Sequence, residues 1–190
     1  MIFSIFCKKL DLSHVDYKRD GRGLHSRREL IRKKYPNSLV YQELRAVLYL
    51  YHAKIFVTTT TSIMECGEVI NLDFLNASDE EIGNAIYDKL LECYSISPDI
   101  LNKTIMKPSD WPVFKASKAK TLKEFRANAI RFEIKTINSA LLIQCKYVES
   151  TNQGEHVGAY ISLGPEATEL GRKIRKLAAM LSKLREMEML

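Results

Sequence analysis

Hydrophobic and polar positions follow the same order in two stretches of the chain, residues 53–94 and 141–182, at a constant offset of 88 positions. Each stretch runs from an apolar segment through a polar turn into a second apolar segment, and then into a helical pattern that opens on acidic residues. Corresponding pairs are Leu75 and Leu163, Glu81 and Glu169, Ile82 and Leu170, Gly83 and Gly171, and Ile86 and Ile174. We interpret the stretches as two copies of one strand–strand–helix unit.

Local signals in the first stretch predict two strands and a helix. The β-branched residues 55–61 predict a strand, and a turn near Cys66 and Gly67 returns the chain through a second strand, from Val69 to Leu75. Ser78 is the N-cap of a helix whose acidic first turn complements the helix dipole. The apolar stripe of this helix consists of Ile82, Ile86, Leu90 and Leu91. Residues 38–51 stay open between helix and strand, since their composition favours a strand while their apolar spacing also fits a helix.

The second stretch belongs to a longer α-β-β-β-α pattern. Thr121 caps a short helix, with Glu124 at the capping-box position. Residues 130–136 alternate with period two, and further strands are predicted from Leu141 to Val148 and from Val157 to Leu163. A final helix over residues 166–187 buries Leu170, Ile174, Leu177, Leu181 and Leu184. This pattern predicts an antiparallel meander with helices on one face.

The predicted fold class is α+β, a mostly antiparallel sheet with helices packed on it, built from the two related strand–strand–helix units. The length of 190 residues suits a single domain over 1–190. We divide it into an N-terminal basic segment 1–36, the first unit 53–94, a linker 95–112 and the second unit 113–187. The linker is assigned from Pro98, Pro108 and Pro112.

The formal net charge of +6 is distributed in blocks. Residues 1–35 carry +6, residues 36–112 carry −6 and residues 113–190 carry +6. A uniformly basic chain would indicate nucleic acid, whereas alternating blocks indicate either distinct charged faces for one complementary partner or ordinary solvated faces. Most aromatic residues lie inside predicted strands, so we expect no direct contact with nucleic acid, although a nucleic-acid-binding module remains an alternative. A second copy of the chain is another partner that such faces allow.

Composition also bears on the cellular location of the protein and on its cofactors. No segment approaches the roughly 18 continuous apolar residues of a membrane span, and no signal sequence is recognisable, so we expect a soluble cytoplasmic protein without a membrane partner. The four cysteines, Cys7, Cys66, Cys93 and Cys145, form no C-x-x-C pair and are expected to be reduced thiols. The four histidines, His14, His25, His52 and His156, have no metal-ligand spacing. We expect neither a metal nor a cofactor.

One strand carries the best pattern for catalysis. Glu133 and Lys135 are separated by one residue and therefore face the same way on a strand, with Asp99 upstream. Metal-dependent nucleases use such an arrangement, in which carboxylates hold Mg²⁺ and a lysine stabilises phosphate charge. Any amphipathic strand gives the same polar-x-polar order, so we assign these residues to structure and expect no enzyme. A metal-dependent nuclease using Glu133 and Lys135 is the weaker alternative.

Several segments together resemble immunity proteins of contact-dependent growth inhibition systems. They are residues 78–83 after the apolar strand 69–75, the stretch from Phe114 through Phe125 to the strand at Ile130, and the closing helix with Glu169-Leu-Gly171. The resemblance covers about residues 53–183. It implies a small cytoplasmic protein that binds and neutralises the C-terminal toxin domain of a cognate effector, commonly a nuclease, so that the chemistry belongs to the partner.

Two charged clusters are the candidates for binding such a toxin. The acidic cluster, suited to a basic toxin, consists of Glu65, Glu68, Asp79 and Glu80. The basic cluster, suited to an acidic toxin, consists of Arg27, Arg28, Arg32 and Lys33. We expect both clusters to be exposed loop or helix-end charges, whose reversal slows association and leaves the thermal midpoint nearly unchanged.

Overall fold

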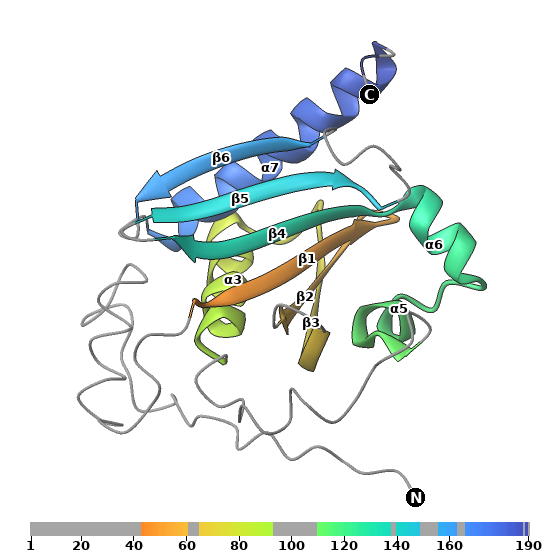
Figure 1. The fold of residues 1–190 in the computed structure, drawn as a ribbon, viewed down its shortest axis with the longest axis horizontal. Coiled ribbons are helices and arrows are strands. Elements are labelled where there is room, and N and C mark those ends of the chain that lie inside the picture. Colours follow the sequence, from red (N-terminus) through yellow and green to blue (C-terminus); the bar gives the residue numbers. More distant parts are fainter. Residues whose placement is uncertain are drawn as a thin grey trace, which may run out of the picture.

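The computed structural model describes residues 43–60, 65–92, 110–137, 140–148, 156–162, 166–187 and 189 (Figure 1). In chain order the elements are β1 (Arg45–Tyr51), β2 (Lys54–Thr60), β3 (Glu65–Asp73), α3 (Asp79–Glu92), α5 (Pro112–Ser117), α6 (Leu122–Asn128), β4 (Ile130–Ile137), β5 (Ala140–Tyr147), β6 (Val157–Ser162) and α7 (Ala167–Glu186). This confirms the predicted α+β class with helices packed on an antiparallel sheet. Most of the proposed linker and the whole basic segment 1–36 lie outside the described residues.

The strands form one six-stranded sheet in the order β3-β2-β1-β4-β5-β6, and every neighbouring pair is antiparallel. The two central strands, β1 and β4, meet with Leu48 opposite Phe132. Each half of the sheet therefore consists of three consecutive strands followed by a helix, one strand more than the unit predicted from sequence. The sequence leaves residues 38–51 open between helix and strand. The part from Arg45 to Tyr51 forms strand β1, which is central in the sheet and buried on both of its faces.

The two faces of the sheet carry different helices. Alternate residues of β1 point in opposite directions, as in any strand. Leu48 belongs to the apolar cluster formed with α3 and α7, whereas Tyr49 belongs to a second cluster formed with α5 and α6. The prediction that the helices of the second half lie on one face is therefore wrong, since α6 and α7 pack on opposite sides.

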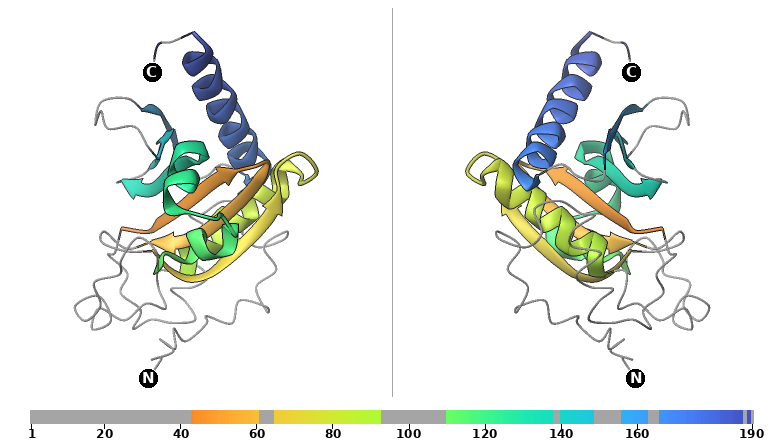
Figure 2. Two further views of the ribbon diagram at one scale, coloured as in Figure 1. Left: turned by 90° about the vertical axis from the view of Figure 1, so that its right-hand side faces the viewer. Right: turned by 90° about the vertical axis from the view of Figure 1, so that its left-hand side faces the viewer.

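The N-terminal parts of α3 and α7 pack against each other (Figure 2), and one glycine of each helix lies at the contact. A Cβ atom on Gly83 would overlap the backbone carbonyl of Ala167, and a Cβ atom on Gly171 would overlap the carbonyl of Asp79. Gly83 and Gly171 are equivalent in the sequence repeat, and so are Asp79 and Ala167. The contact is thus reciprocal, and it places the two halves about a pseudo-two-fold axis.

Most predicted elements agree with the structure, and three details do not. Cys66 and Gly67 lie within β3, near an irregularity in its pairing with β2, instead of in a turn. Leu75 lies beyond the end of β3 and is 75% exposed, while its predicted counterpart Leu163 is outside the described residues. The offset of 88 holds for the helices but not for the central hairpins, whose last paired residues, Tyr51 with Lys54 and Ile137 with Ala140, are 86 positions apart. Loop lengths within the two halves therefore differ.

Helix starts and buried stripes follow the sequence closely. Ser78 Oγ accepts the Glu81 N–H, and the Glu81 carboxylate accepts the Ser78 N–H, which completes a capping box at the start of α3. Thr121 Oγ1 likewise accepts the Glu124 N–H at 3.0 Å. The predicted core residues of α3 and α7 are buried: Ile82, Ile86, Leu90, Leu91, Leu170, Ile174, Leu177 and Leu181. Leu184 is only half-buried; it lies in the last turn of α7, and the C-terminal end of this helix extends past the sheet (Figure 1).

Two further expectations can be checked within the described part. Neither Cys66 nor Cys145 forms a disulfide in that part of the chain, and burial raises the pKa of the Cys145 thiol to about 11, which makes it unreactive at neutral pH. Cys7 and Cys93 lie outside the described residues. None of the described helices combines the length and the apolarity needed to cross a bilayer.

Candidate functional site

A polar cleft of about 320 Å³ lies on the face of the sheet that carries α5 and α6. Its charged and aromatic lining comes from four strands, from α6 and from the residue before α5. The cations are Arg45, Arg126, Arg131, Lys135 and Lys146, the carboxylates are Glu65 and Glu133, and the aromatic side chains are Tyr49 and Trp111. Charged side chains and a concave surface therefore coincide at this place.

The central strands position these side chains by simple alternation. Along β4, the even-numbered Ile130, Phe132 and Ile134 are buried in the main core, so the odd-numbered residues face the cleft. The register then sets Lys135 opposite Arg45 and Arg131 opposite both Tyr49 and Lys146. Basic residues on three neighbouring strands are thereby gathered at one place.

Glu65 is the most unusual residue of the cleft, because its carboxylate is almost completely buried. Only 5% of the residue is exposed, and the Tyr49 hydroxyl donates a 2.6 Å hydrogen bond to Oε1. Oε2 has no hydrogen-bond partner among the described residues. Burial raises the pKa of the Glu65 carboxyl, although the Tyr49 hydrogen bond and the nearby Arg131 charge act in the opposite direction. Glu65 is therefore not the exposed charge that the sequence suggested.

The raised pKa of Glu65 leads to a testable dependence of stability on pH. The folded state holds this proton to a higher pH than the unfolded chain, whose ordinary value is 4.5. The contribution of Glu65 to the free energy of unfolding is therefore fully present below pH 4.5 and is lost as the pH rises through the folded pKa. Glu65→Gln should flatten the fall in thermal midpoint measured from pH 4.5 to pH 8. Glu68→Gln removes an exposed carboxyl on the same strand and serves as the control for the change in net charge. Equal profiles for wild type and Glu65→Gln would contradict the argument.

The cations of the cleft differ in how far they are already neutralised. Arg131 forms an ion pair with Glu133, and Arg45 forms one with Glu43, just outside the lining. Lys135 lies 4.0 Å from the same Glu43 carboxylate. Within the described residues, Arg126 and Lys146 form no ion pair, and the Arg126 guanidinium lies 5.7 Å from the centroid of the Trp111 ring. The cleft therefore keeps a positive excess.

The nuclease hypothesis gains one element of geometry and no more. Glu133 and Lys135 face the same way and line the same cleft, as the strand pattern predicted. The Glu133 carboxylate, however, is bound to Arg131, and Asp99 lies outside the described residues. The described part of the chain contains no group of three or more His, Cys, Asp or Glu side chains that could hold a metal ion.

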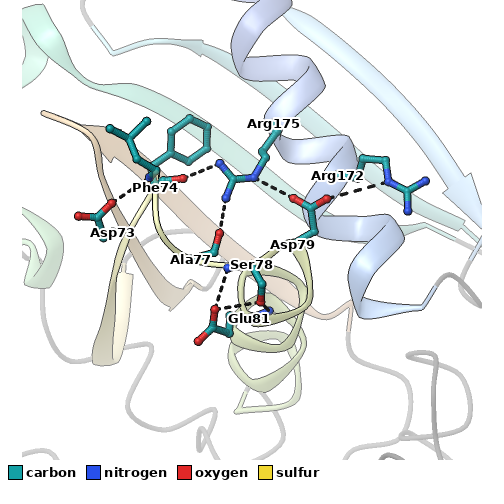
Figure 3. Close-up of polar contacts among 9 residues, drawn as sticks. Asp73, Phe74, Ala77, Ser78, Asp79, Glu81, Arg172 and Arg175 are labelled. Carbon is teal, nitrogen blue, oxygen red and sulfur yellow. Dashed lines mark hydrogen bonds and ion pairs between the residues drawn. The ribbon is translucent and has the colours of Figure 1, made fainter.

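Asp79, a candidate toxin-binding residue, is used within the fold (Figure 3). Arg175 Nε of α7 donates to Asp79 Oδ1 at 2.8 Å, and its guanidinium also donates to the carbonyls of Phe74 and Ala77. The same guanidinium lies 4.7 Å from the centroid of the Phe74 ring, and Arg172 is 4.0 Å from Asp79 Oδ2. Reversal of the Asp79 charge would break this junction between the halves, so the expectation of an unchanged thermal midpoint does not hold for Asp79.

The remaining candidate residues are not brought together. Glu80 is exposed at the start of α3 and Glu68 is exposed on β3, whereas Glu65 lies in the cleft on the other face of the sheet. The basic candidates Arg27, Arg28, Arg32 and Lys33 lie outside the described residues. The acidic cluster is therefore not one surface.

Sequence reasoning missed most of the cleft. Arg126 and Trp111 were assigned to a helix and a linker, and Tyr49 was in the ambiguous segment. The one available signal was the period-two strand 130–136, whose polar positions include Arg131. Nothing local indicates that Glu65 lies beside Tyr49, because the two residues belong to strands separated by β2 in the sheet.

Two solved structures share this fold at low sequence identity. One is a chain of a CdiA-CT/CdiI toxin and immunity complex from Yersinia pseudotuberculosis, with a TM-score of 0.54 and 16% identity over 73% of this chain and 97% of that chain. The other is a protein of unknown function from Neisseria meningitidis, with a TM-score of 0.53 and 17% identity over 70% of this chain and 92% of that chain. No protein-family model matches the sequence, and no curated protein matches it either.

Proposed function

We propose that this protein is an immunity protein that binds and neutralises the toxin domain of a cognate contact-dependent growth inhibition effector. The observation that carries the proposal is the fold shared with a chain of the Yersinia pseudotuberculosis toxin and immunity complex, because the likeness covers 97% of that chain. The sequence resemblance over residues 53–183 supports the same class independently of the fold. The partner is a protein toxin domain, and binding takes place in the cytoplasm of the cell that is protected.

In this proposal the protein acts by binding its partner and not by catalysis. The carboxylates of the cleft are engaged within the fold, Glu133 by Arg131 and Glu65 by Tyr49. Neutralisation then requires only that the protein cover the active site of the toxin or an essential surface beside it. Such pairs reach nanomolar dissociation constants, equivalent to about −12 kcal/mol.

Co-expression with the C-terminal toxin domain of a contact-dependent growth inhibition effector from the same genome tests the proposal. Cells producing that toxin domain should grow when this protein is present, and the purified pair should elute as one complex. An unrelated toxin domain is the control and should kill regardless. The proposal fails if every such toxin domain from the same genome still kills cells that contain the folded protein. Metal-dependent cleavage of RNA or DNA by the purified protein, abolished in Glu133→Ala, would instead support the nuclease alternative.

A further inference from the structure

We infer that the cleft between β4, β5 and α6 receives an acidic segment of the partner protein, with Arg126 and Lys146 as the main contacts to its carboxylates. This inference rests on the proposed function and names the chemistry of the partner surface. It assigns the binding role to a site different from both charged clusters suggested by the sequence.

Charge is the first argument. Five cations and two carboxylates line the cleft, so its lining keeps a net positive charge whether Glu65 is ionised or neutral. Arg131, Arg45 and Lys135 are partly neutralised by Glu133 and Glu43. Arg126 and Lys146 form no ion pair with a described residue, and both are half-buried, so they are partly desolvated before a partner arrives. A carboxylate entering between them would meet two unpaired cations in a shielded place, where charge-assisted hydrogen bonds are strong.

The side-chain types at the cleft favour a protein partner over nucleic acid. Trp111 lies under the Arg126 guanidinium, and tryptophan and arginine are the side chains that most often dominate the energy of protein interfaces. Nucleic-acid interfaces are larger and much more uniformly positive. Here Glu133 at the cleft and Glu43 beside it, at 44% and 36% exposed, interrupt the cations, so the surface is not uniformly positive. The cleft volume lies near the lower end of the ~300–1,000 Å³ range of ligand pockets, which suits a few side chains of one segment.

The test uses Trp111, which is the single tryptophan of the chain and therefore reports on this cleft alone. The probe is a short synthetic peptide of alternating glutamate and glycine, titrated at low salt while tryptophan emission is recorded. Its glutamine counterpart serves as the uncharged control. We expect saturable binding of the glutamate peptide, weakened by added salt, and no saturable signal from the glutamine peptide.

Charge reversal at the cleft should remove this binding. Arg126→Glu and Lys146→Glu should each raise the dissociation constant by about tenfold, which is about 1.4 kcal/mol, and the double variant should raise it further. Lys176→Glu, the same charge change at an exposed site on α7 across the sheet, should leave it within about twofold. Circular dichroism confirms that each variant is folded, and the two single variants provide independent tests.

Two results would overturn the inference. One is peptide binding that is absent, or is equal in wild type and in both folded single variants. The other is a single-stranded RNA of the same charge that binds the wild type more tightly than the peptide and loses affinity in the same variants. Because the titration contains no toxin, its outcome is separate from the co-expression test. A protein that protects cells but does not bind the glutamate peptide disproves only the inference, and one that binds the peptide but does not protect disproves only the proposed function.

Discussion

Alanine at Gly83 or at Gly171 is expected to lower the free energy of unfolding by roughly 1–3 kcal/mol, as overpacking of a close contact does. In an isolated helix the same change would stabilise by about 1 kcal/mol, because alanine is the better helix former. The sign reverses here because each new Cβ would overlap a backbone carbonyl of the opposite helix, and a backbone cannot rotate away as a side chain can. Urea denaturation of the two single variants measures the effect.

Because the contact between the two helices is reciprocal, the two glycine variants can be compared with each other. Gly83 and Gly171 occupy equivalent positions, so the two losses should agree within about 1 kcal/mol. Gly158→Ala is the control. Gly158 is an exposed strand residue, and a Cβ atom there would lie 3.3 Å from the Ile143 carbonyl oxygen. We expect a small change for that variant. A Gly83→Ala or Gly171→Ala protein as stable as the wild type would mean that the helices do not cross at these glycines.

Truncation of Ile82 or of Leu170 to alanine should cost about 2–5 kcal/mol, the usual range for large-to-small changes in a core. Both side chains are fully buried beneath the sheet, one on α3 and one on α7, at the equivalent positions that the repeat predicts. Equivalent positions leave cavities with similar surroundings, so the two losses should be of similar size. Chemical denaturation of each variant gives the free energies to compare.

Leu75→Ala provides the matched control for these core variants. Leu75 is 75% exposed, so its truncation should change the free energy of unfolding by less than about 0.5 kcal/mol. A loss below about 1 kcal/mol at both Ile82 and Leu170 would remove the energetic basis of the repeat. The similarity between residues 53–94 and 141–182 would then be a coincidence of pattern.

Some parts of this structure are determined by residues close together in the sequence. The N-caps at Ser78 and Thr121 are local, because each side chain accepts the N–H of a residue three positions further along the chain. The alternation of β4 over residues 130–137 and the apolar stripe of α7 follow from the periods of a strand and a helix. These local signals were enough to predict the fold class, the repeat and most element positions.

Other features were decided by contacts between distant parts of the chain. Residues 45–51 form a strand because pairing on both edges and burial on both faces override their mixed local preference. Gly83 and Gly171 looked like ordinary repeat positions, and only the crossing of α3 with α7 requires them to lack a side chain. Asp79 is bound by Arg175, which is 96 positions away in the sequence.

The cleft depends on tertiary structure most of all. Glu65 and Tyr49 meet across the sheet, Arg131 and Lys146 lie opposite each other through strand register, and α6 brings Arg126 over Trp111. The hydrophobic periodicity of the sequence does not predict these contacts, because strand register and helix placement are set by the burial of the whole core. The sequence by itself determined which segments form strands and helices, and the packing of the two halves about the sheet decided which charges share a surface.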